Sequence, residues 1–231
     1  MYRILICDDQ KDIVSALKIY LAPEGYEILE AYNGRQAVDI VSREDIHLVL
    51  LDIMMPVMDG IAATEQIRKV SNVPIIFLTA KAESEDMIKG LNAGADDYIT
   101  KPFVPGEVLA RVRSQLRRYA SLGSRPADAE NVLTIGSISL DDRSKVVTVD
   151  GAVVSLTPTE YSILRLLMSN PGTVYSTKAL YEAVWQEAPL GADGAVAVHI
   201  RHLREKIEIN PSEPRYLKVV WGQGYKLEGD S

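Results

Sequence analysis

The sequence contains little of what a secreted or membrane-spanning protein would need. Cys7 is the single cysteine among 231 residues, so no disulfide can form within the chain. The apolar runs are short, and none approaches the length of about 20 residues that spans a bilayer. The first residues lead directly into a strand pattern, without the features of a signal peptide. We therefore predict a soluble cytoplasmic protein.

An excess of positive charge is also absent. The 25 Lys and Arg residues are outnumbered by 32 Asp and Glu residues, which gives a formal net charge of -7. This argues against a chain that coats nucleic acid through its overall charge, but it allows a local basic surface. A content of 47% hydrophobic and 25% charged residues indicates a globular protein with a sizeable core, in one or two domains.

The first half of the sequence alternates short apolar runs with amphipathic stretches. The runs at residues 4–7, 48–51 and 73–78 lack polar alternation, which favours strands covered on both faces in a parallel sheet. The segments between them have helical spacing, for example at Ile13, Leu17 and Leu21. Repeated strand–helix units predict a doubly wound α/β domain, in which functional groups collect at the carboxyl ends of the strands.

Polar residues of complementary chemistry follow these strands. They are Asp8, Asp9, Asp52, Thr79 and, after a strand at residues 98–100, Lys101. Three neighbouring carboxylates would repel one another unless a hard cation such as Mg²⁺ bound between them. A carboxylate can also act as a nucleophile, and a lysine and a hydroxyl can neutralise and bind the phosphoryl group that it accepts. The set therefore predicts a phosphoryl-transfer site.

Each of these residues has a simpler explanation when it is taken alone. An Asp-Asp pair is more often an anion at a helix N-terminus, Asp52 could be an N-cap or turn residue, and Lys101 could be a surface lysine. Four strand ends that carry the appropriate group in the appropriate order are much harder to explain in this way.

Residues 1 to about 120 resemble the receiver domain of response regulators. The matching stretches are residues 6–9, 51–60, 78–80 and 94–103. The resemblance implies that Asp52 is the phosphoacceptor, that Asp8, Asp9, Asp52 and the backbone carbonyl of Met54 hold Mg²⁺, and that a sensor histidine kinase is the phosphodonor. It also implies that Thr79 and Lys101 contact the phosphoryl group, that Tyr98 rotates inward on activation, and that the Lys101–Pro102 bond is cis.

The resemblance implies a dimer surface around the strand at residues 98–100. Its charged members are Lys89, Asp96, Asp97, Glu107 and Arg111, around an apolar patch of Ile88, Leu91 and Leu109. In similar regulators, this face makes a symmetric homodimer through intermolecular ion pairs, of which Asp97 with Arg111 fits the pattern. Met87 stands where a basic partner of Glu107 is usual, and Lys89 is an alternative partner. Without the resemblance, such exposed charges would be read as solvated, each pair contributing about 0–1 kcal/mol.

A polar segment without periodicity at residues 121–131 predicts a flexible linker. After it, strand patterns at residues 133–135, 145–149 and 153–156 are separated by turn sequences. Helices are predicted from Pro158 to Met168, from Thr177 to Val184 and from Val196 to Ile207, followed by a hairpin at residues 217–227. Three helices and a hairpin in this order indicate a winged-helix domain.

The third of these helices has a regular buried stripe and several cations. Val196, Ile200, Leu203 and Ile207 form the stripe, which leads us to expect that His199, Arg201, His202, Arg204 and Lys206 point outward along one exposed side, suited to a major groove. Glu205 and Glu208 dilute this charge, and an ordinary amphipathic helix is the simpler explanation of the segment alone. From residue 121 onward, 11 Lys and Arg stand against 14 Asp and Glu, so a local surface would have to attract DNA.

Residues 132–228 resemble the winged-helix effector domain of OmpR/PhoB-type regulators, over residues 156–164, 198–207 and 222–225. The resemblance implies DNA contacts by Thr177, Lys178, His199, Arg201, His202, Arg204 and Tyr225. Gly194 and Trp221 stand where arginines are common, which weakens the expected backbone and minor-groove contacts. The Trp221 pattern is similar to that of vancomycin-resistance regulators.

Together these features predict a doubly wound, flavodoxin-like receiver at residues 1–120, a linker at 121–131 and an α+β winged-helix domain at 132–228. The predicted function is transcriptional regulation: phosphorylated Asp52 drives dimerisation on direct-repeat sites in promoter DNA, with RNA polymerase as a further candidate partner. An aspartyl-phosphate phosphatase is less compatible, because it would want a carboxylate where Met54 stands. A regulator that needs no phosphorylation would have an incomplete acidic or lysine set, whereas this set is complete.

Overall fold

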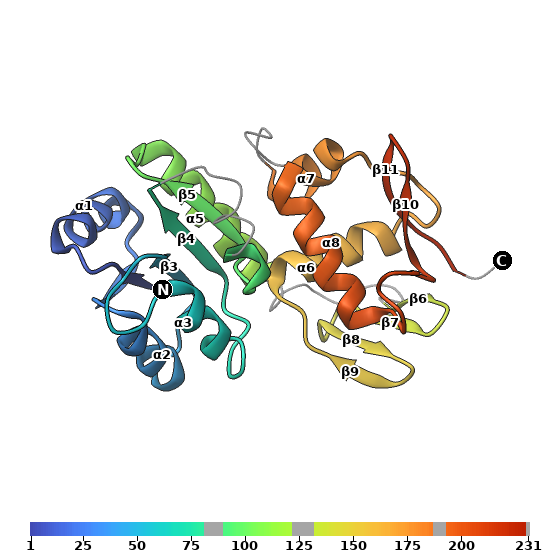
Figure 1. Cartoon of the computed structure of the whole chain (residues 1–231), viewed down its shortest axis with the longest axis horizontal. Coiled ribbons are helices and arrows are strands. Elements are labelled where there is room, and N and C mark those ends of the chain that lie inside the picture. Colours follow the sequence, from blue (N-terminus) through green and yellow to red (C-terminus); the bar gives the residue numbers. More distant parts are fainter. Residues whose placement is uncertain (81–89, 122–131, 187–192, 230–231) are drawn as a thin grey trace. The chain divides into compact units, whose positions relative to one another are not determined.

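The chain divides into two compact units, Met1–Tyr119 and Ala120–Ser231 (Figure 1). The computed structural model describes residues 1–80, 90–121, 132–186 and 193–229. We describe each unit by itself, as the receiver unit and the effector unit. No helix among the described residues is both long and apolar enough to cross a membrane.

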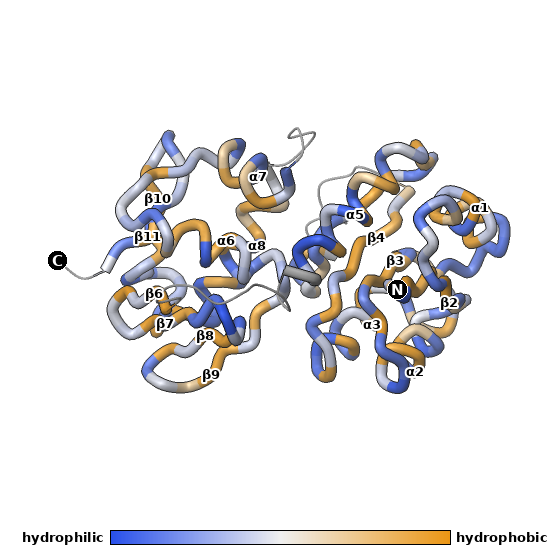
Figure 2. The backbone as a smooth tube through the Cα atoms, turned by 180° about the vertical axis from the view of Figure 1, so that it is seen from behind, coloured by the Kyte–Doolittle hydropathy of each residue, from blue (hydrophilic) through white to orange (hydrophobic). Residues whose placement is uncertain are grey.

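The receiver unit is built on a five-stranded parallel sheet in the order β2-β1-β3-β4-β5. The strands are β1 (Arg3–Cys7), β2 (Glu27–Ala31), β3 (Leu48–Asp52), β4 (Ile75–Thr79) and β5 (Asp97–Thr100). Strands β3 and β4 are buried along their whole length, as their unbroken apolar runs predict, and the hydropathy colouring shows the same runs (Figure 2). The sequence patterns did not reveal β2, because this edge strand is only partly buried and begins with Glu27.

Helices cover both faces of this sheet. They are α1 (Lys11–Leu21), α2 (Gly34–Arg43), α3 (Gly60–Ile67) and α5 (Pro105–Ser121), with a short 3₁₀ turn, η1 (Ala22–Glu24). Apolar residues of α1 and α5 form one core with alternate strand residues such as Ile4 and Ile6. The intervening Leu5 is also fully buried, and it points to the opposite face because side chains alternate along a strand. Side chains cap two helices, Asn33 at α2 and Asp59 at α3.

The effector unit opens with a four-stranded antiparallel sheet in the order β6-β7-β8-β9. Its strands are β6 (Val132–Ile135), β7 (Ile138–Asp141), β8 (Val146–Val149) and β9 (Ala152–Val154). The sequence predicted three strands here and missed β7. That strand is only four residues long and follows β6 through a tight turn in which Gly136 has a φ of +58°.

Three helices and a hairpin complete the effector unit. They are α6 (Pro158–Met168), α7 (Thr177–Trp185), α8 (Asp193–Ile207) and the β10 (Leu217–Val220)–β11 (Gly224–Leu227) hairpin. Thr157 and Glu160 form the predicted capping box at α6, and Ser176 caps α7. The predicted stripe of α8 is confirmed as part of one core with α6, α7 and the hairpin.

Candidate functional site

An acidic pocket lies at the carboxyl end of the receiver sheet. Asp8 directly follows β1 and is fully buried, whereas Asp52 ends β3 and is 5% exposed. Asp9 is exposed, and carboxylate oxygens of all three residues lie within 4.8 Å of one another. The structure therefore brings together the three carboxylates that the sequence placed at separate strand ends.

Lys101 bridges two of these carboxylates. Its Nζ donates to Asp8 Oδ2 at 2.7 Å and to Asp52 Oδ1 at 2.8 Å. Burial raises the pKa of Asp52, and the hydrogen bond from Lys101 opposes that rise. Burial by itself would lower the pKa of Lys101, but its hydrogen bonds to Asp52 and Asp8 outweigh this and raise it. Both effects follow from charged groups held together in a poorly solvated pocket.

The charge of this pocket fits a divalent cation. Three carboxylates face one lysine, so their formal sum is two negative charges, and the oxygens are the hard ligands that Mg²⁺ prefers. Asp8, Asp9 and Asp52 would hold the ion, which would add positive charge to that of Lys101 in the same pocket.

The backbone around the pocket is tightly packed. Gly60 lies so close to β3 that a Cβ atom there would stand 2.2 Å from the carbonyl oxygen of Asp52, so only glycine fits. The Lys101–Pro102 peptide is cis, as expected, and the Lys101 amide donates to Thr79 O at 2.7 Å. Thr79 ends β4 and is 6% exposed. The structure thus places Thr79 and Lys101 at the carboxyl ends of adjacent strands.

The predicted dimer pair Asp97–Arg111 closes within one chain. Arg111 Nη1 donates to Asp97 Oδ1 at 2.8 Å, and its Nε donates to Glu107 at 3.1 Å. The same guanidinium lies 5.7 Å from the ring centroid of the half-buried Tyr98, whose pKa burial raises. Asp97 was expected to bind Arg111 of a second chain, but it already binds Arg111 of its own chain.

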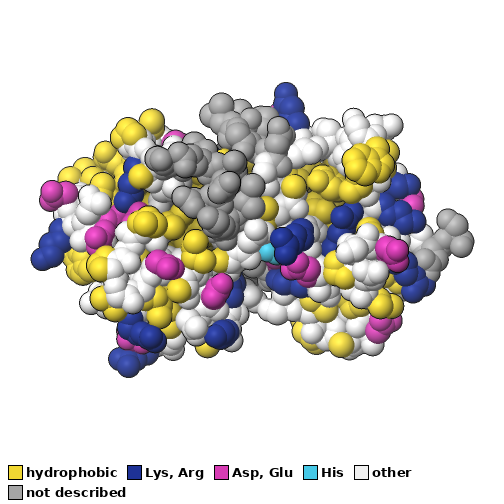
Figure 3. Space-filling model, in the orientation of Figure 1, with side chains coloured by type: hydrophobic (Ala, Val, Ile, Leu, Met, Phe, Trp, Pro, Cys, Tyr) yellow, Lys and Arg dark blue, Asp and Glu magenta, His cyan; other side chains and the backbone are white. Residues whose placement is uncertain are grey.

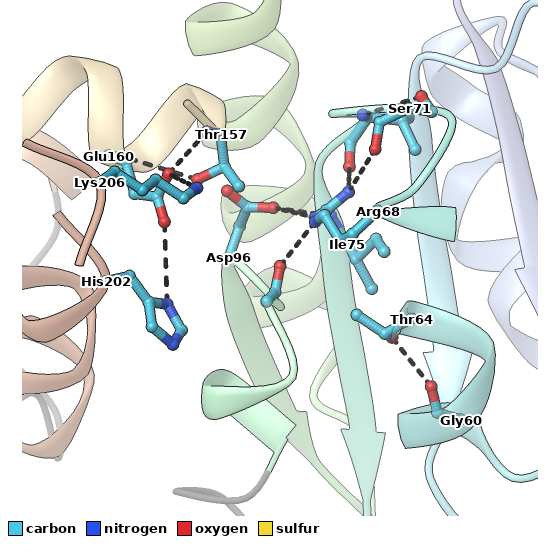
Figure 4. Close-up of polar contacts among 12 residues, drawn as sticks. Gly60, Thr64, Arg68, Ser71, Ile75, Asp96, Thr157, Glu160, His202 and Lys206 are labelled. Atoms are coloured by element: carbon cyan, nitrogen blue, oxygen red, sulfur yellow. Dashed lines mark hydrogen bonds and ion pairs between the residues drawn. The ribbon is translucent and has the colours of Figure 1, made fainter. Parts of the chain in front are cut away.

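Two other members of the predicted dimer surface are buried, so their expected exposure was wrong. Asp96 is fully buried, where its Oδ2 accepts from Arg68 at 2.9 Å and from the amide of Ile75 at 3.0 Å (Figure 4). Leu91 is also fully buried, and Leu109 packs partly against the core. The sequence patterns could not show that Arg68 of α3's C-cap would bind Asp96. Met87, Ile88 and Lys89 lie outside the described residues.

The orientation predicted for the histidines of α8 is also wrong. His199 is 1% exposed and packs beside the Trp185 ring, and His202 is 9% exposed. Arg204 is partly buried, and its guanidinium donates twice to Leu217 O of β10, at 2.9 and 2.8 Å. Arg201 does point outward, with a side chain 64% exposed and paired with Glu205. The outward side of α8 therefore carries fewer cations than the spacing predicted.

The buried polar centre between α6 and α8 is Glu160, which the sequence assigned only to the capping box. Its Oε2 accepts from the amide of Thr157 at 2.8 Å and from Lys206 Nζ at 2.6 Å (Figure 4). Its Oε1 faces His202 Nδ1 at 3.7 Å. Burial lowers the pKa of His202, and the charge of Glu160 opposes this only in part. A lysine and a histidine at i+4 on α8 could have suggested a shared acidic partner.

A groove of about 370 Å³ separates the N-terminus of α7 from the β10–β11 hairpin. Thr177, Lys178 and Tyr225 line it, so these three predicted contact residues lie together. The side chain of Lys178 is 69% exposed, and Trp221 in the hairpin turn is 91% exposed. Lys and Arg side chains gather over α8 and this hairpin on the face drawn in Figure 3. The surface therefore combines helix-terminal N–H groups and cations with one large aromatic side chain.

Comparison with known proteins agrees with both halves of this description. Residues 4–113 match the model "Response regulator receiver domain", and residues 151–227 match "Transcriptional regulatory protein, C terminal". The chain is 40% identical to regulatory protein VanR of Enterococcus faecium over 98% of both chains. It is 42% identical to transcriptional regulatory protein ResD of Bacillus subtilis, over 98% of this chain and 95% of that protein.

The chain belongs to the OmpR/PhoB-type response regulators. Among solved structures, it is similar to response regulator DrrB, a Thermotoga maritima OmpR/PhoB homologue, with 31% identity, a TM-score of 0.52 and coverage of 99% of this chain and 100% of that one. Membership confirms the predicted family and fold class, and makes the chain a DNA-binding transcriptional regulator of a two-component system rather than a conventional enzyme. A receiver domain implies a histidine kinase as partner.

Proposed function

We propose that this regulator is switched on when a sensor histidine kinase phosphorylates Asp52. The observation that carries the proposal is the bridge from Lys101 to both Asp8 and Asp52, at 2.7 and 2.8 Å, in a pocket with an excess of carboxylate. Such a pocket keeps a nucleophilic carboxylate next to a fixed cation, which phosphoryl transfer requires. Asp8, Asp9, Asp52 and the Met54 carbonyl would hold Mg²⁺, which neutralises charge on the incoming phosphoryl group.

The remaining residues of the pocket respond to the new phosphoryl group. The Asp52 carboxylate attacks phosphorus, the bond to the kinase histidine breaks, and Lys101 turns from bridging carboxylates to binding a phosphoryl oxygen. The hydroxyl of Thr79, at the end of the neighbouring strand, donates to another oxygen. Movement of Thr79 would vacate space for Tyr98, which lies half-buried on the adjacent β5. This couples Asp52 to the Arg111 side of the domain.

The proposed output is binding of the effector domain, residues 132–228, to direct-repeat sites in promoter DNA. Residues 1–120 are the proposed receiver, and the linker predicted at residues 121–131 lies, except for residue 121, outside the described residues. Arg201 and Lys178 carry the exposed charge for phosphates or base edges, and Thr177 lies in the first turn of α7. Tyr225 supports the hairpin, because it exchanges backbone hydrogen bonds of 2.8 and 2.9 Å with Tyr175. RNA polymerase is a further proposed partner, and the proposed location of a regulator that binds promoter DNA is the cytoplasm.

Phosphorylation is proposed to favour a homodimer through the surface around β5 and α5. Since Asp97 and Glu107 already bind Arg111 within the chain, a second copy must exchange these ion pairs rather than satisfy unpaired charges. Exchange makes the dimer sensitive to the Tyr98 side chain, which lies beneath the same guanidinium. Arg111→Glu should therefore keep phosphorylation but abolish the shift to dimer in sedimentation. A phosphorylated Arg111→Glu protein that still sediments as a dimer would contradict this surface.

The chemistry is tested with a small phosphodonor. Acetyl phosphate with Mg²⁺ should add one labile acyl phosphate, seen as a mass increase of the intact chain, and Asp52→Asn should abolish it. Asp39→Asn, an exposed carboxylate of α2, is the matched control and should be phosphorylated normally. An undiminished phosphate signal in Asp52→Asn would assign the phosphoacceptor elsewhere.

A further inference from the structure

The buried cluster between α6 and α8 has the composition of a transition-metal site. Its members are His199 and His202 of α8 and Glu160 of α6, which each offer one ligand atom, and these atoms lie within 4.8 Å of one another. We propose that this cluster binds Zn²⁺ or a metal of similar preference, with two imidazoles and one carboxylate oxygen as ligands. The site is separate from the acidic pocket of the receiver unit.

The spacing between His202 and Glu160 suits a shared metal better than a direct hydrogen bond. His202 Nδ1 and Glu160 Oε1 are 3.7 Å apart, beyond the usual hydrogen-bond distance of about 2.7–3.2 Å. Two ligands that each lie about 2.0–2.1 Å from one tetrahedral Zn²⁺ are separated by roughly 3.4 Å. A small inward movement of this pair would therefore give the separation of two zinc ligands, and a nitrogen of His199 lies within 4.8 Å of the other two ligand atoms of the cluster.

The surroundings hold the carboxylate in the orientation that this site needs. Glu160 Oε2 accepts from the Thr157 amide at 2.8 Å, and Oε1 is directed towards His202 (Figure 4). Such a backbone contact orients a metal ligand, whereas Lys206 Nζ, at 2.6 Å from Oε2, competes with a metal for the negative charge of the same carboxylate. The Trp185 ring beside His199 provides an apolar wall, with ring centroids 5.7 Å apart. An ion could enter past His202 and Lys206, whose side chains are 11% and 33% exposed.

The donor set also defines the class of metal. Imidazole nitrogen favours Zn²⁺, Co²⁺, Ni²⁺ or Cu²⁺, whereas the all-oxygen receiver pocket favours Mg²⁺. Because the ligands come from two helices, a bound ion would tie α8 to α6. It would stabilise the effector unit without requiring phosphorylation of Asp52.

The test uses the full chain in excess Mg²⁺, so that the receiver pocket is filled. Titration against a chromophoric Zn²⁺ chelator should show one Zn²⁺ per chain, and Co²⁺ should give the intense visible absorption of a tetrahedral site. His202→Gln should weaken Zn²⁺ binding at least about tenfold, because loss of a ligand costs at least as much affinity as loss of a contact that orients one. The matched control is His47→Gln, the third histidine of the chain, which lies in the receiver unit and should bind Zn²⁺ like the wild type.

A second variant separates a metal site from a structural histidine cluster. Lys206→Met removes a cation that competes for Glu160, so Zn²⁺ affinity should rise severalfold, a change that a purely structural role of the cluster does not predict. Circular dichroism checks that each variant is folded. The proposal is overturned if Zn²⁺ binding is unchanged in His202→Gln, is lost equally in His47→Gln, or fails to tighten in Lys206→Met.

Discussion

Each half of the protein buries a carboxylate that accepts a hydrogen bond from a lysine. In the receiver unit, Lys101 binds Asp52 at 2.8 Å, and in the effector unit, Lys206 binds Glu160 at 2.6 Å. The neighbours differ. Asp52 shares its lysine with Asp8 and lies near Asp9, whereas Glu160 also accepts from the Thr157 amide. One carboxylate is held among like charges and the other is held by donors.

This difference separates a site that is costly to fold without a bound cation from a site whose own hydrogen bonds stabilise the fold. Gathering like charges costs folding free energy, and the protein recovers it when a cation or a phosphoryl group binds there. A carboxylate with a backbone donor and a lysine instead stabilises the helix that it caps. The two halves should therefore respond in opposite directions when the negative charge is removed.

The largest effect is expected at Glu160. Glu160→Ala removes the capping-box bond and leaves Lys206 without its partner, so the free energy of unfolding of the effector unit should fall by about 3 kcal/mol. Both tryptophans, Trp185 and Trp221, lie in this unit, so denaturation in EDTA followed by tryptophan fluorescence reports on it alone. Glu182→Ala, whose 49%-exposed side chain pairs with Lys178 at the surface, is the control and should change stability by less than about 0.5 kcal/mol. If both variants lost the same free energy of unfolding, the buried Glu160 would be no more important for stability than the exposed Glu182.

Arg201 and Arg204 distinguish exposed from buried charge within the effector unit. Arg201→Ala should weaken operator binding about tenfold, or about 1.4 kcal/mol, and reduce the log–log salt slope, without loss of stability. Arg204→Ala should weaken binding together with stability, because its guanidinium holds Leu217 O of the hairpin. Fluorescence anisotropy at several salt concentrations measures both, with Arg143→Ala, an exposed arginine between β7 and β8, as control. If Arg201→Ala bound the operator with wild-type affinity, α8 would not be the DNA-recognition helix.

The opposite sign is expected at Asp52. Because the folded-state pKa of Asp52 is raised, its contribution to stability is present at low pH and is lost as the pH rises through that pKa. At neutral pH without divalent cations, Asp52→Asn should therefore stabilise the receiver unit, by about 1 kcal/mol. In Mg²⁺ the wild type should become more stable than Asp52→Asn, since only the wild type binds the ion well. Calorimetry with and without Mg²⁺ checks this, and a destabilised Asp52→Asn without Mg²⁺ would contradict the charge argument.

The smallest effect concerns Trp221, an uncharged side chain on the proposed DNA surface. Its large exposed ring can pack against sugars or base edges, so Trp221→Ala should weaken binding about threefold and leave the salt slope unchanged. Lys178→Ala should instead reduce the slope by about 1. Added DNA should also protect Trp221 from a fluorescence quencher, while the fully buried Trp185 is protected throughout. If Trp221→Ala lowered the salt slope of DNA binding, the contact made by the turn of the β10–β11 hairpin would not be apolar.

Elements with strong local signals could be predicted from the sequence. The buried runs of β1, β3 and β4, the Thr157–Glu160 capping box and the apolar stripe of α8 are properties of neighbouring residues, and all were found as predicted. The meeting of Asp8, Asp52 and Lys101 was also predictable, because parallel strands end at one edge of a sheet. Strand β2 was missed because it is only partly buried, and β7 was missed because it offers only two apolar residues, Ile138 and Leu140, before the turn sequence that begins at Asp141.

The tertiary structure alone decided which polar partners each charged residue has. Asp96 and Arg68 are 28 residues apart, and Glu160 and Lys206 are 46 residues apart, so no local pattern links them. The apolar stripe of α8 showed which side of the helix faces the core, but it did not show how many neighbouring residues are also buried. His199 and His202 lie beside that stripe, and α6 and α7 extend far enough to cover them. Periodicity specifies which side of a helix faces the core, but the neighbouring helices determine how much of the rest is shielded from water.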